Sequence, residues 1–148
     1  MANNPQVAQG TLNKVRASVV VPSYTNLNID SSHMAKKFVT TTPDGDSVMQ
    51  PETATGIVNS PEPYVMYTIT VGILRSQALA ASWQSQMETQ SSIGRVIVHP
   101  DSAAFPSLTF YNCSILRIDP GPFDGSDPTV DVQLRGVYQT NSDLWNFT

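Results

Sequence analysis

Charged residues are scarce in this sequence. Only 14% of its 148 residues are Asp, Glu, Lys or Arg, whereas soluble domains average about 25%. The hydrophobic fraction is 40%, and the chain holds 11 prolines and 8 glycines. Uncharged polar residues fill the difference. This composition disfavours a helical bundle and favours a turn-rich, mainly β protein. The length predicts a single domain spanning 1–148.

The sequence also has one cysteine and no long apolar run. Cys113 on its own excludes an intrachain disulfide and a multi-cysteine zinc site. Because no run of about 18 apolar residues is present, we expect no membrane anchor. The first residues carry neither a basic start nor an apolar segment, so we expect no secretion signal there.

The sequence also lacks a basic patch. Eight Lys and Arg residues are scattered among twelve Asp and Glu residues, for a formal net charge of −4. A protein that grips nucleic acid needs clustered cations to neutralise phosphates. Lys36 and Lys37 are adjacent, but such a pair is typical of a solvated strand face or loop. The sequence therefore argues against a surface that holds nucleic acid.

Alternating apolar and polar residues run through most of the chain and predict β-strands. The first such stretch starts at Lys14, after a polar N-terminal arm at 1–13, and its parity continues to Ile29. We predict further strands at 64–73, 95–99, 107–118 and 130–138. The last two form a hairpin around a wide turn, and a slip in parity near Asn112 predicts a β-bulge. The C-terminal tail, 139–148, ends in two aromatic residues that need a groove or a partner.

One long helix is predicted at about 76–90. Ser76 is a suitable N-cap, because its hydroxyl can accept a hydrogen bond from a free backbone N–H group. Leu79, Trp83 and Met87 then recur every four residues and form one stripe. Such a stripe indicates core packing rather than a cofactor site. We therefore expect the helix to lie over a sheet or across the end of a small barrel.

Residues 31–63 form a long, mostly extended excursion broken by several prolines. Long connections are uncommon in compact domains and often contact a partner. Within the excursion, Phe38 to Met49 predicts a hairpin that turns at Pro43-Asp44-Gly45-Asp46. Our candidates for contact with a partner come from this hairpin: Phe38, Thr40, Thr42, Pro43, Asp44, Gly45, Asp46, Val48 and Met49.

Motifs of known chemistry are missing. The sequence has no glycine-rich phosphate loop, no nucleophile elbow and no zinc-binding His-Glu-x-x-His helix. We therefore expect a protein that is not an enzyme and that uses no metal or cofactor. His33 and His99 are more simply surface or boundary residues than ligands or bases. One alternative stays open, a metal-binding β-sandwich module or hydrolase, whose ligands would be Asp119, Asp124, Asp127 and Asp131.

Five phrases carry a resemblance to a known family. They are SPEPY at 60–64, ITVGILRSQALA at 69–80, IGRVIV at 93–98, FYNC at 110–113, and the close at 127–138. Together they look like the tail tube proteins of contractile-tailed bacteriophages, to which the tubes of contractile bacteriocins and type VI secretion systems are related. The resemblance spans residues 14 to 145 and rests on the order and spacing of elements rather than on one motif.

The resemblance implies both a fold and a role. The fold is a small antiparallel β-barrel or sandwich with one flanking helix. The role is structural: six copies form a ring, and rings stack into the inner tube of a virion tail, the conduit for genome ejection inside a contractile sheath. The implied partners are other copies, the sheath protein, the baseplate, the tail terminator and a tape measure protein in the lumen. Assembly in the cytoplasm of a host bacterium is implied as well.

Elementary physics is consistent with this role. A small sheet has free edges that invite pairing with another chain. A polar, net-negative wall repels phosphate, so DNA passes through without being held. A related secretion or bacteriocin tube and a tail terminator ring are kept as alternatives.

Overall fold

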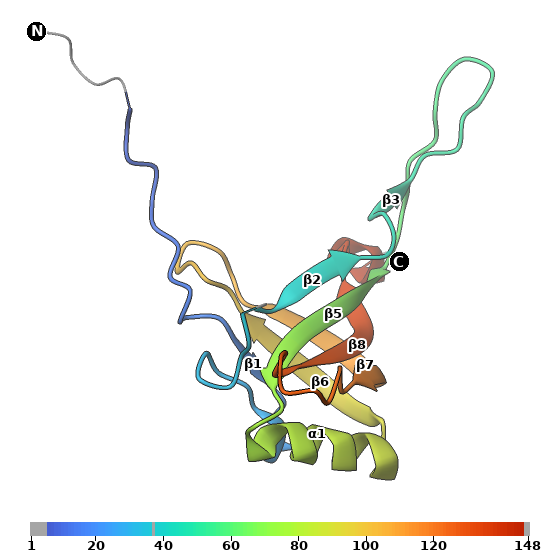
Figure 1. Ribbon diagram of the computed structural model, residues 1–148. Coiled ribbons are helices and arrows are strands. Elements are labelled where there is room, and N and C mark those ends of the chain that lie inside the picture. Colours follow the sequence, from blue (N-terminus) through green and yellow to red (C-terminus); the bar gives the residue numbers. More distant parts are fainter. Residues whose placement is uncertain (1–5, 37, 147–148) are drawn as a thin grey trace, which may run out of the picture.

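The computed structural model describes residues 6–36 and 38–146. Six antiparallel strands form one curled sheet in the order β1-β6-β7-β8-β5-β2 (Figure 1). They are β1 (Ser18–Val20), β2 (Thr40–Pro43), β5 (Tyr64–Leu74), β6 (Ser92–His99), β7 (Leu108–Asp119) and β8 (Thr129–Gln139). A second, two-stranded sheet pairs β3 (Val48–Met49) with β4 (Ser60–Pro61). The predicted mainly β fold with one flanking helix is confirmed, and the main sheet is a half-barrel.

The inner face of the half-barrel carries the core. β5 and β8 pair along their whole lengths, from Tyr64 opposite Gln139 to Leu74 opposite Thr129. Alternate residues of both strands point inward and are buried: Ile69, Val71, Ile73, Val130, Val132 and Leu134. The alternation predicted for these two strands is confirmed. It divides the sheet into an apolar inner face and a polar outer face.

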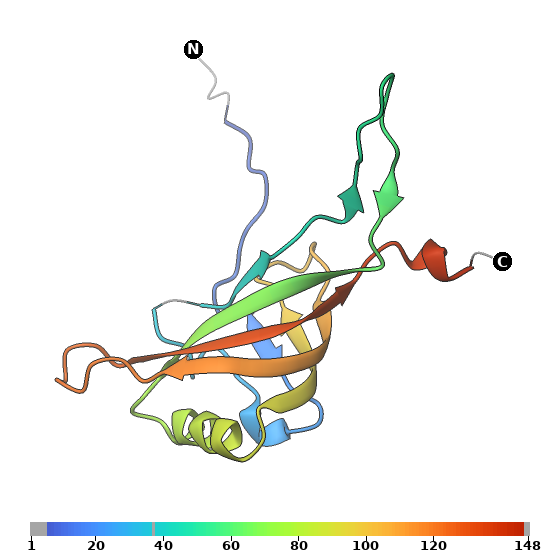
Figure 2. The same cartoon turned by 90° about the vertical axis from the view of Figure 1, so that its right-hand side faces the viewer.

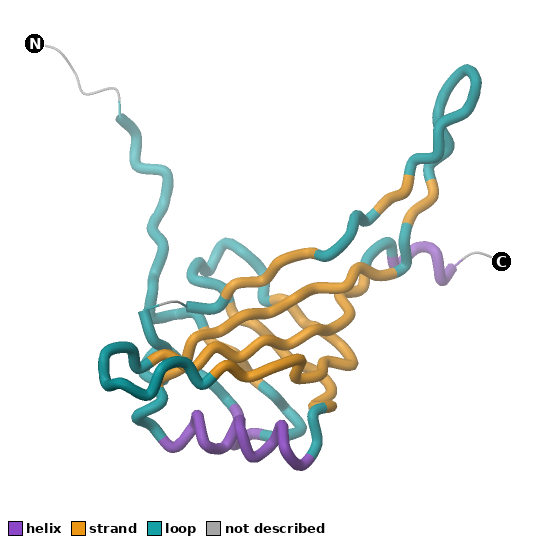
Figure 3. The backbone as a smooth tube through the Cα atoms, turned by 45° about the vertical axis from the view of Figure 1, so that its right-hand side comes forward, coloured by secondary structure: helices purple, strands orange, loops and turns teal. Residues whose placement is uncertain are grey.

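The helix α1 (Ala78–Thr89) lies across one open end of the half-barrel, beside the 3-10 helix η1 (Thr25–Leu27) (Figures 1 and 3). Trp83 is fully buried, and Leu79 and Met87 pack against the core from partly buried positions. The predicted stripe is therefore a packing surface.

The predicted N-cap at Ser76 is wrong. Gln77 occupies the cap position with an extended backbone, and its side chain makes no capping hydrogen bond. The preceding turn is tied elsewhere, because the Arg75 N–H donates to the carbonyl of Pro128 and the Gln77 N–H to that of Leu74. These bonds hold the chain out of helical geometry until residue 78.

The first strand is shorter than predicted. β1 starts at Ser18 rather than Lys14, because Asn13 builds a turn before it. The Asn13 side chain accepts the Val15 N–H, and its carbonyl accepts the Arg16 N–H. Val15 is consequently 68% exposed, although the later apolar residues of the same stretch are buried as predicted.

A bulge in β7 confirms the slip in parity predicted near Asn112. This residue has φ of 52°, in the left-handed region that Asn tolerates, and the pairing with β8 shifts between residues 111 and 114. The bulge turns Cys113 inward over Gly136, where a Cβ would collide with the cysteine sulfur. β6 also starts at Ser92 rather than Arg95, since pairing with β7 continues through irregular positions around Gly94.

The predicted hairpin from Phe38 to Met49 is wrong. β2 pairs with β5, and β3 pairs with β4. The segment Pro43-Asp44-Gly45-Asp46 is therefore a link between two sheets rather than a reversing turn. Asp44 sets its direction, because its N–H donates to the Met66 carbonyl and its carboxylate accepts a hydrogen bond from Thr68 Oγ1. These contacts hold the chain along β5 at the point where a hairpin would have reversed it.

Four segments project from the half-barrel (Figure 2). The β3–β4 hairpin and residues 6–13 of the N-terminal arm rise from the same end, opposite α1 (Figures 1 and 2). The 120–128 loop and the C-terminal 3-10 helix η2 (Ser142–Asn146) extend in opposite directions from the two ends of β8. The molecule therefore has two unlike ends and two unlike sides.

We predict that Trp83→Ala lowers the free energy of unfolding by about 3–5 kcal/mol, because it leaves a large cavity under α1. The control is Ser85→Ala, an exposed position on the same helix, with an expected change within about 0.5 kcal/mol. Urea unfolding followed by circular dichroism measures both. Equal stability of the Trp83 variant and the wild type would contradict the burial of this side chain.

Candidate functional site

The strongest candidate is the hairpin arm, which we define as residues 44–62. Beyond the β3–β4 pair its ladder continues through a bridge between Glu52 and Ile57 and a hydrogen bond from the Gln50 side chain to Asn59. Met49, Ile57 and Val58 are 55%, 54% and 53% exposed. An ordered, projecting hairpin with apolar side chains in solvent is typical of an interaction surface.

Asp44 holds one side of the root of the arm. Besides Thr68, its Oδ2 atom accepts a hydrogen bond from Arg135 Nε at 3.3 Å, which also makes an ion pair. Both partners belong to the main sheet, on β5 and β8. Asp44 is thus the point at which the arm leaves the sheet in a defined direction.

Asn141 holds the other side of the root. Its Nδ2 donates to the carbonyls of Ser47 and Glu62, each at 2.8 Å, so one side chain joins both strands of the arm. The residue has φ of 48°, a left-handed conformation that Asn adopts more readily than most residues. Thr140 adds a bond from its Oγ1 to the Glu62 carbonyl. The arm and the C-terminal segment therefore form one connected unit.

A free sheet edge lies beside the arm. The hydrogen bond from the Asp44 N–H to the Met66 carbonyl sets which residues of β2 bond to β5. Thr42 and Thr40 therefore direct their backbone hydrogen-bonding groups toward β5, and Thr41 and Pro43 direct theirs away from it. Pro43 is tolerated there because its nitrogen has no hydrogen to donate. No strand flanks β2 on its outer side within residues 6–36 and 38–146. This edge is available to another chain.

The predicted contact residues fall into three places. Phe38 packs against the core, Thr40, Thr42 and Pro43 belong to β2, and the remainder lie in the hairpin arm: Asp44, Gly45, Asp46, Val48 and Met49. Sequence reasoning missed Ile57 and Val58, the apolar pair at the bridge with Glu52. Their adjacency in an otherwise polar stretch was the available signal. It also missed Asn141, whose role depends on contacts 79 and 94 residues away.

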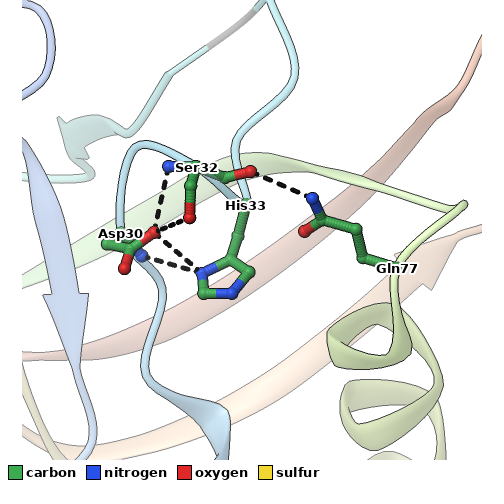
Figure 4. A network of polar contacts seen from close by, with 4 residues as sticks. All are labelled: Asp30, Ser32, His33 and Gln77. Carbon is green, nitrogen blue, oxygen red and sulfur yellow. Dashed lines mark hydrogen bonds and ion pairs between the residues drawn. The ribbon is translucent and has the colours of Figure 1, made fainter.

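A polar network joins Asp30, Ser32, His33 and Gln77 (Figure 4). The Ser32 hydroxyl donates to Asp30 Oδ1, and this bond lowers the pKa of the Asp30 carboxyl from its ordinary value. His33 Nδ1 lies 3.0 Å from the same oxygen, and Gln77 Nε2 donates to the Ser32 carbonyl. The Ser32 hydroxyl bonds to Asp30 rather than to His33, so the nucleophile–base pair of a hydrolase is not formed. The network ties residues 30–33 to the start of α1.

Asp119, Asp124 and Asp127 make turn contacts, whereas Asp131 lies within β8. Asp124 accepts the N–H and hydroxyl of Ser126, and the hydroxyl contact lowers the pKa of its carboxyl. Asp127 accepts the N–H of Thr129, which lowers its pKa in the same way. In the described part of the chain, no three His, Cys, Asp or Glu side chains are grouped as a metal would require. These contacts are the turn chemistry of Asp.

Arg75 fastens the 120–128 loop to the body. Its guanidinium donates to the carbonyls of Pro120 and Asp127 and lies 5.2 Å from the centroid of the Phe123 ring. The loop is thereby fixed as a projection from the end of the β7–β8 hairpin, with Phe123 presented at its surface. The Arg75 side chain thus holds the loop by hydrogen bonds and by a cation–π contact together.

Cys113 is the remaining group of potential reactivity. It is fully buried in β7, and burial raises the pKa of its thiol to about 12. The thiol is therefore protonated near neutral pH and shielded from reagents.

Comparisons with known proteins assign this chain to no family. No protein-family model matches the chain, and no curated protein matches it. Among solved structures, the chain is similar to one from the cryo-EM structure of the anti-feeding prophage cap (AFP tube terminating cap), with a TM-score of 0.48 and 10% sequence identity. The match covers 93% of this chain and 97% of that chain. A likeness at this level assigns neither family nor function. Within the described ranges, every helix is too short or too polar to span a membrane.

We predict that Asn141→Gly loosens the hairpin arm without unfolding the sheet. Glycine keeps the left-handed backbone but removes two hydrogen bonds, each worth about 0.5–1.5 kcal/mol. Amide hydrogen exchange at 47–62 should accelerate roughly tenfold or more, with exchange in β5 and β8 unchanged. The neighbouring substitution Ser142→Ala is the matched control. Unaltered exchange in the arm would show that Asn141 does not hold its root.

Proposed function

We propose that this chain is a structural subunit of a hollow protein tube, the inner tube of a contractile tail or of a related injection machine. Copies join into rings, and rings stack. The observation that supports this most is the hairpin arm, which is ordered, anchored at two points of its root and tipped with exposed apolar residues. The resemblance of the five sequence phrases to tail tube proteins supports the same reading.

The energetics favour contact with further copies. Complete burial of a fully exposed apolar side chain contributes roughly 1.5–3 kcal/mol. Met49, Ile57 and Val58 are each about half exposed, so each would contribute roughly half of that on docking. An arm repeated on every subunit multiplies this contribution around a ring. Because the two sides and the two ends of the subunit are unlike, contacts between copies join different surfaces. Such head-to-tail contacts give closed rings in one direction and open stacks in another.

The outer face of the half-barrel has the chemistry of a conduit wall. Its side chains on β2, β5 and β8 include Thr40, Thr42, Thr68, Thr70 and Gln133. Arg135, on the same face, is paired with Asp44. We place the part of this face on β2, β5 and β8 toward the lumen, because its hydroxyl and amide groups do not hold a phosphate backbone. Arg117 on β7, opposite Gln133, is an exposed cation that we place outside that lumen-facing part. DNA and a tape measure protein would then pass along it.

The remaining partners follow from the same proposal. A sheath protein would surround the tube, and a baseplate and a tail terminator would contact its two ends. The chain would act in the virion tail after assembly in the cytoplasm of a host bacterium. The chain would assemble into the tube and let DNA pass through it, and it would catalyse no reaction.

Electron microscopy of concentrated, negatively stained protein tests the proposal. We expect rings and tubes from the wild type. In a variant in which Asn-Gly replaces residues 50–59, a two-residue turn closes β3 on β4, and we expect the fold to persist while tube formation needs a roughly tenfold or higher concentration. Ala54→Ser, in the same loop, is the control and should assemble like the wild type.

Three outcomes separate the readings. Protein that stays monomeric at every concentration contradicts the proposal. Normal tubes from the shortened variant would remove the arm from the assembly contacts. Single rings that never stack would favour the alternative of a terminator ring.

A further inference from the structure

A groove runs between the two edges of the curled sheet. Its volume is about 240 Å³. The segments that precede β1 and β2, the adjoining ends of β6 and β7 and the loop between β6 and β7 contribute its apolar lining: Ala17, Phe38, Val39, Val98, Phe105 and Leu108. Phe105 is 56% exposed at this site. The groove is thus a strip of apolar surface at the place where the half-barrel stays open.

The two sides of the groove differ in their hydrogen bonding. On the β1 side, Val19 exchanges two backbone hydrogen bonds with Ile29, each at 2.8 Å, so this edge is already paired. On the β2 side, Thr41 lines the groove and directs its backbone groups outward. An extended segment entering the groove would therefore find apolar contacts and one free edge.

The charges near the groove are opposite to those of the hairpin arm. Lys14 lines the groove and Arg16 lies two residues further on, and neither has an ion pair in the part of the chain that the structure describes. Asp101 is the acidic residue in the lining. The arm contains four acidic residues and no basic one: Asp44, Asp46, Glu52 and Glu62. With Asp44 paired to Arg135, three carboxylates remain for cations elsewhere.

The chain's own arm does not occupy this groove. In Figure 1 the arm rises on one side of the half-barrel, and the 100–107 loop beside the groove lies on the other. Residues 44–62 are absent from its lining. The groove is therefore not filled by the arm of its own chain.

We propose that the groove receives the hairpin arm of a second copy of this chain. Ile57 and Val58 of the incoming arm would contact Phe105 and Leu108, and Glu52 would face Lys14. This inference rests on the proposed function and adds to it the surface that receives the arm. Because the arm and the groove are different surfaces of one subunit, each copy gives one arm and accepts another, as a head-to-tail assembly requires.

Cross-linking between two variants, each with one added cysteine, tests the proposal. Thr55→Cys places a thiol at the tip of the arm, and Ala104→Cys places one beside the groove, and both positions are exposed. The native Cys113 is buried and does not compete. The two variants are mixed, assembled and treated with a short bismaleimide, so that a covalent pair of unlike chains can form only between copies. The control mixture combines Thr55→Cys with Ser85→Cys, an exposed position on α1 at the opposite end.

We expect covalent dimers of unlike chains from the groove mixture at a yield at least fivefold above the control mixture. Equal yields, or no such dimers in a sample that contains rings or tubes, would overturn the groove as the receiving surface and leave the proposed function standing. A sample with neither assemblies nor dimers would overturn both.

Charge reversal gives an independent readout. Lys14→Glu should raise the protein concentration needed for assembly several-fold, and combining it with Glu52→Lys should restore most of the loss. If the double variant assembles no better than Lys14→Glu alone, the predicted pairing between arm and groove is wrong.

Discussion

A sheet that curls without closing leaves backbone hydrogen-bonding groups at its edges, and an open edge is a liability unless something pairs with it. In this chain Ile29 pairs with the β1 edge, and α1 covers one end of the half-barrel. The β2 edge stays open at Thr41, and the chain leaves the sheet directly afterwards as the hairpin arm. The open β2 edge and the projecting arm thus both lie where the sheet does not close into a barrel.

The root of the arm turns this geometry into a defined surface. Asp44 ties the outgoing strand to β5 and β8, and Asn141 ties both strands of the arm to the C-terminal segment. An arm held at two points loses less conformational entropy on docking than a free loop. Apolar side chains on a pre-positioned arm are a more effective contact than the same residues in a flexible tail.

The strands and the helix were readable from the sequence because their signals are local. Alternation predicted β5 and β8, the slip at Asn112 predicted the bulge, and the spacing through Trp83 predicted the packed helix face. The prediction of a hairpin from Phe38 to Met49 is wrong for the opposite reason, because distant contacts decide the pairing of this segment. Pro43 to Asp46 carries local turn chemistry, but the free side of β5 offered a pairing more than twenty residues away. The part played by Asn141 likewise depends on distant contacts.

The most direct test of the open β2 edge is amide hydrogen exchange at Thr41, measured in dilute protein and again in protein concentrated enough for the proposed assembly. If another copy completes the sheet, the Thr41 amide exchanges quickly when dilute and slows by a large factor on assembly, while amides inside β5 and β8 change little. An equally fast Thr41 amide in assembled protein would contradict pairing at this edge. Slow exchange already present in dilute subunits would show that the edge was never open.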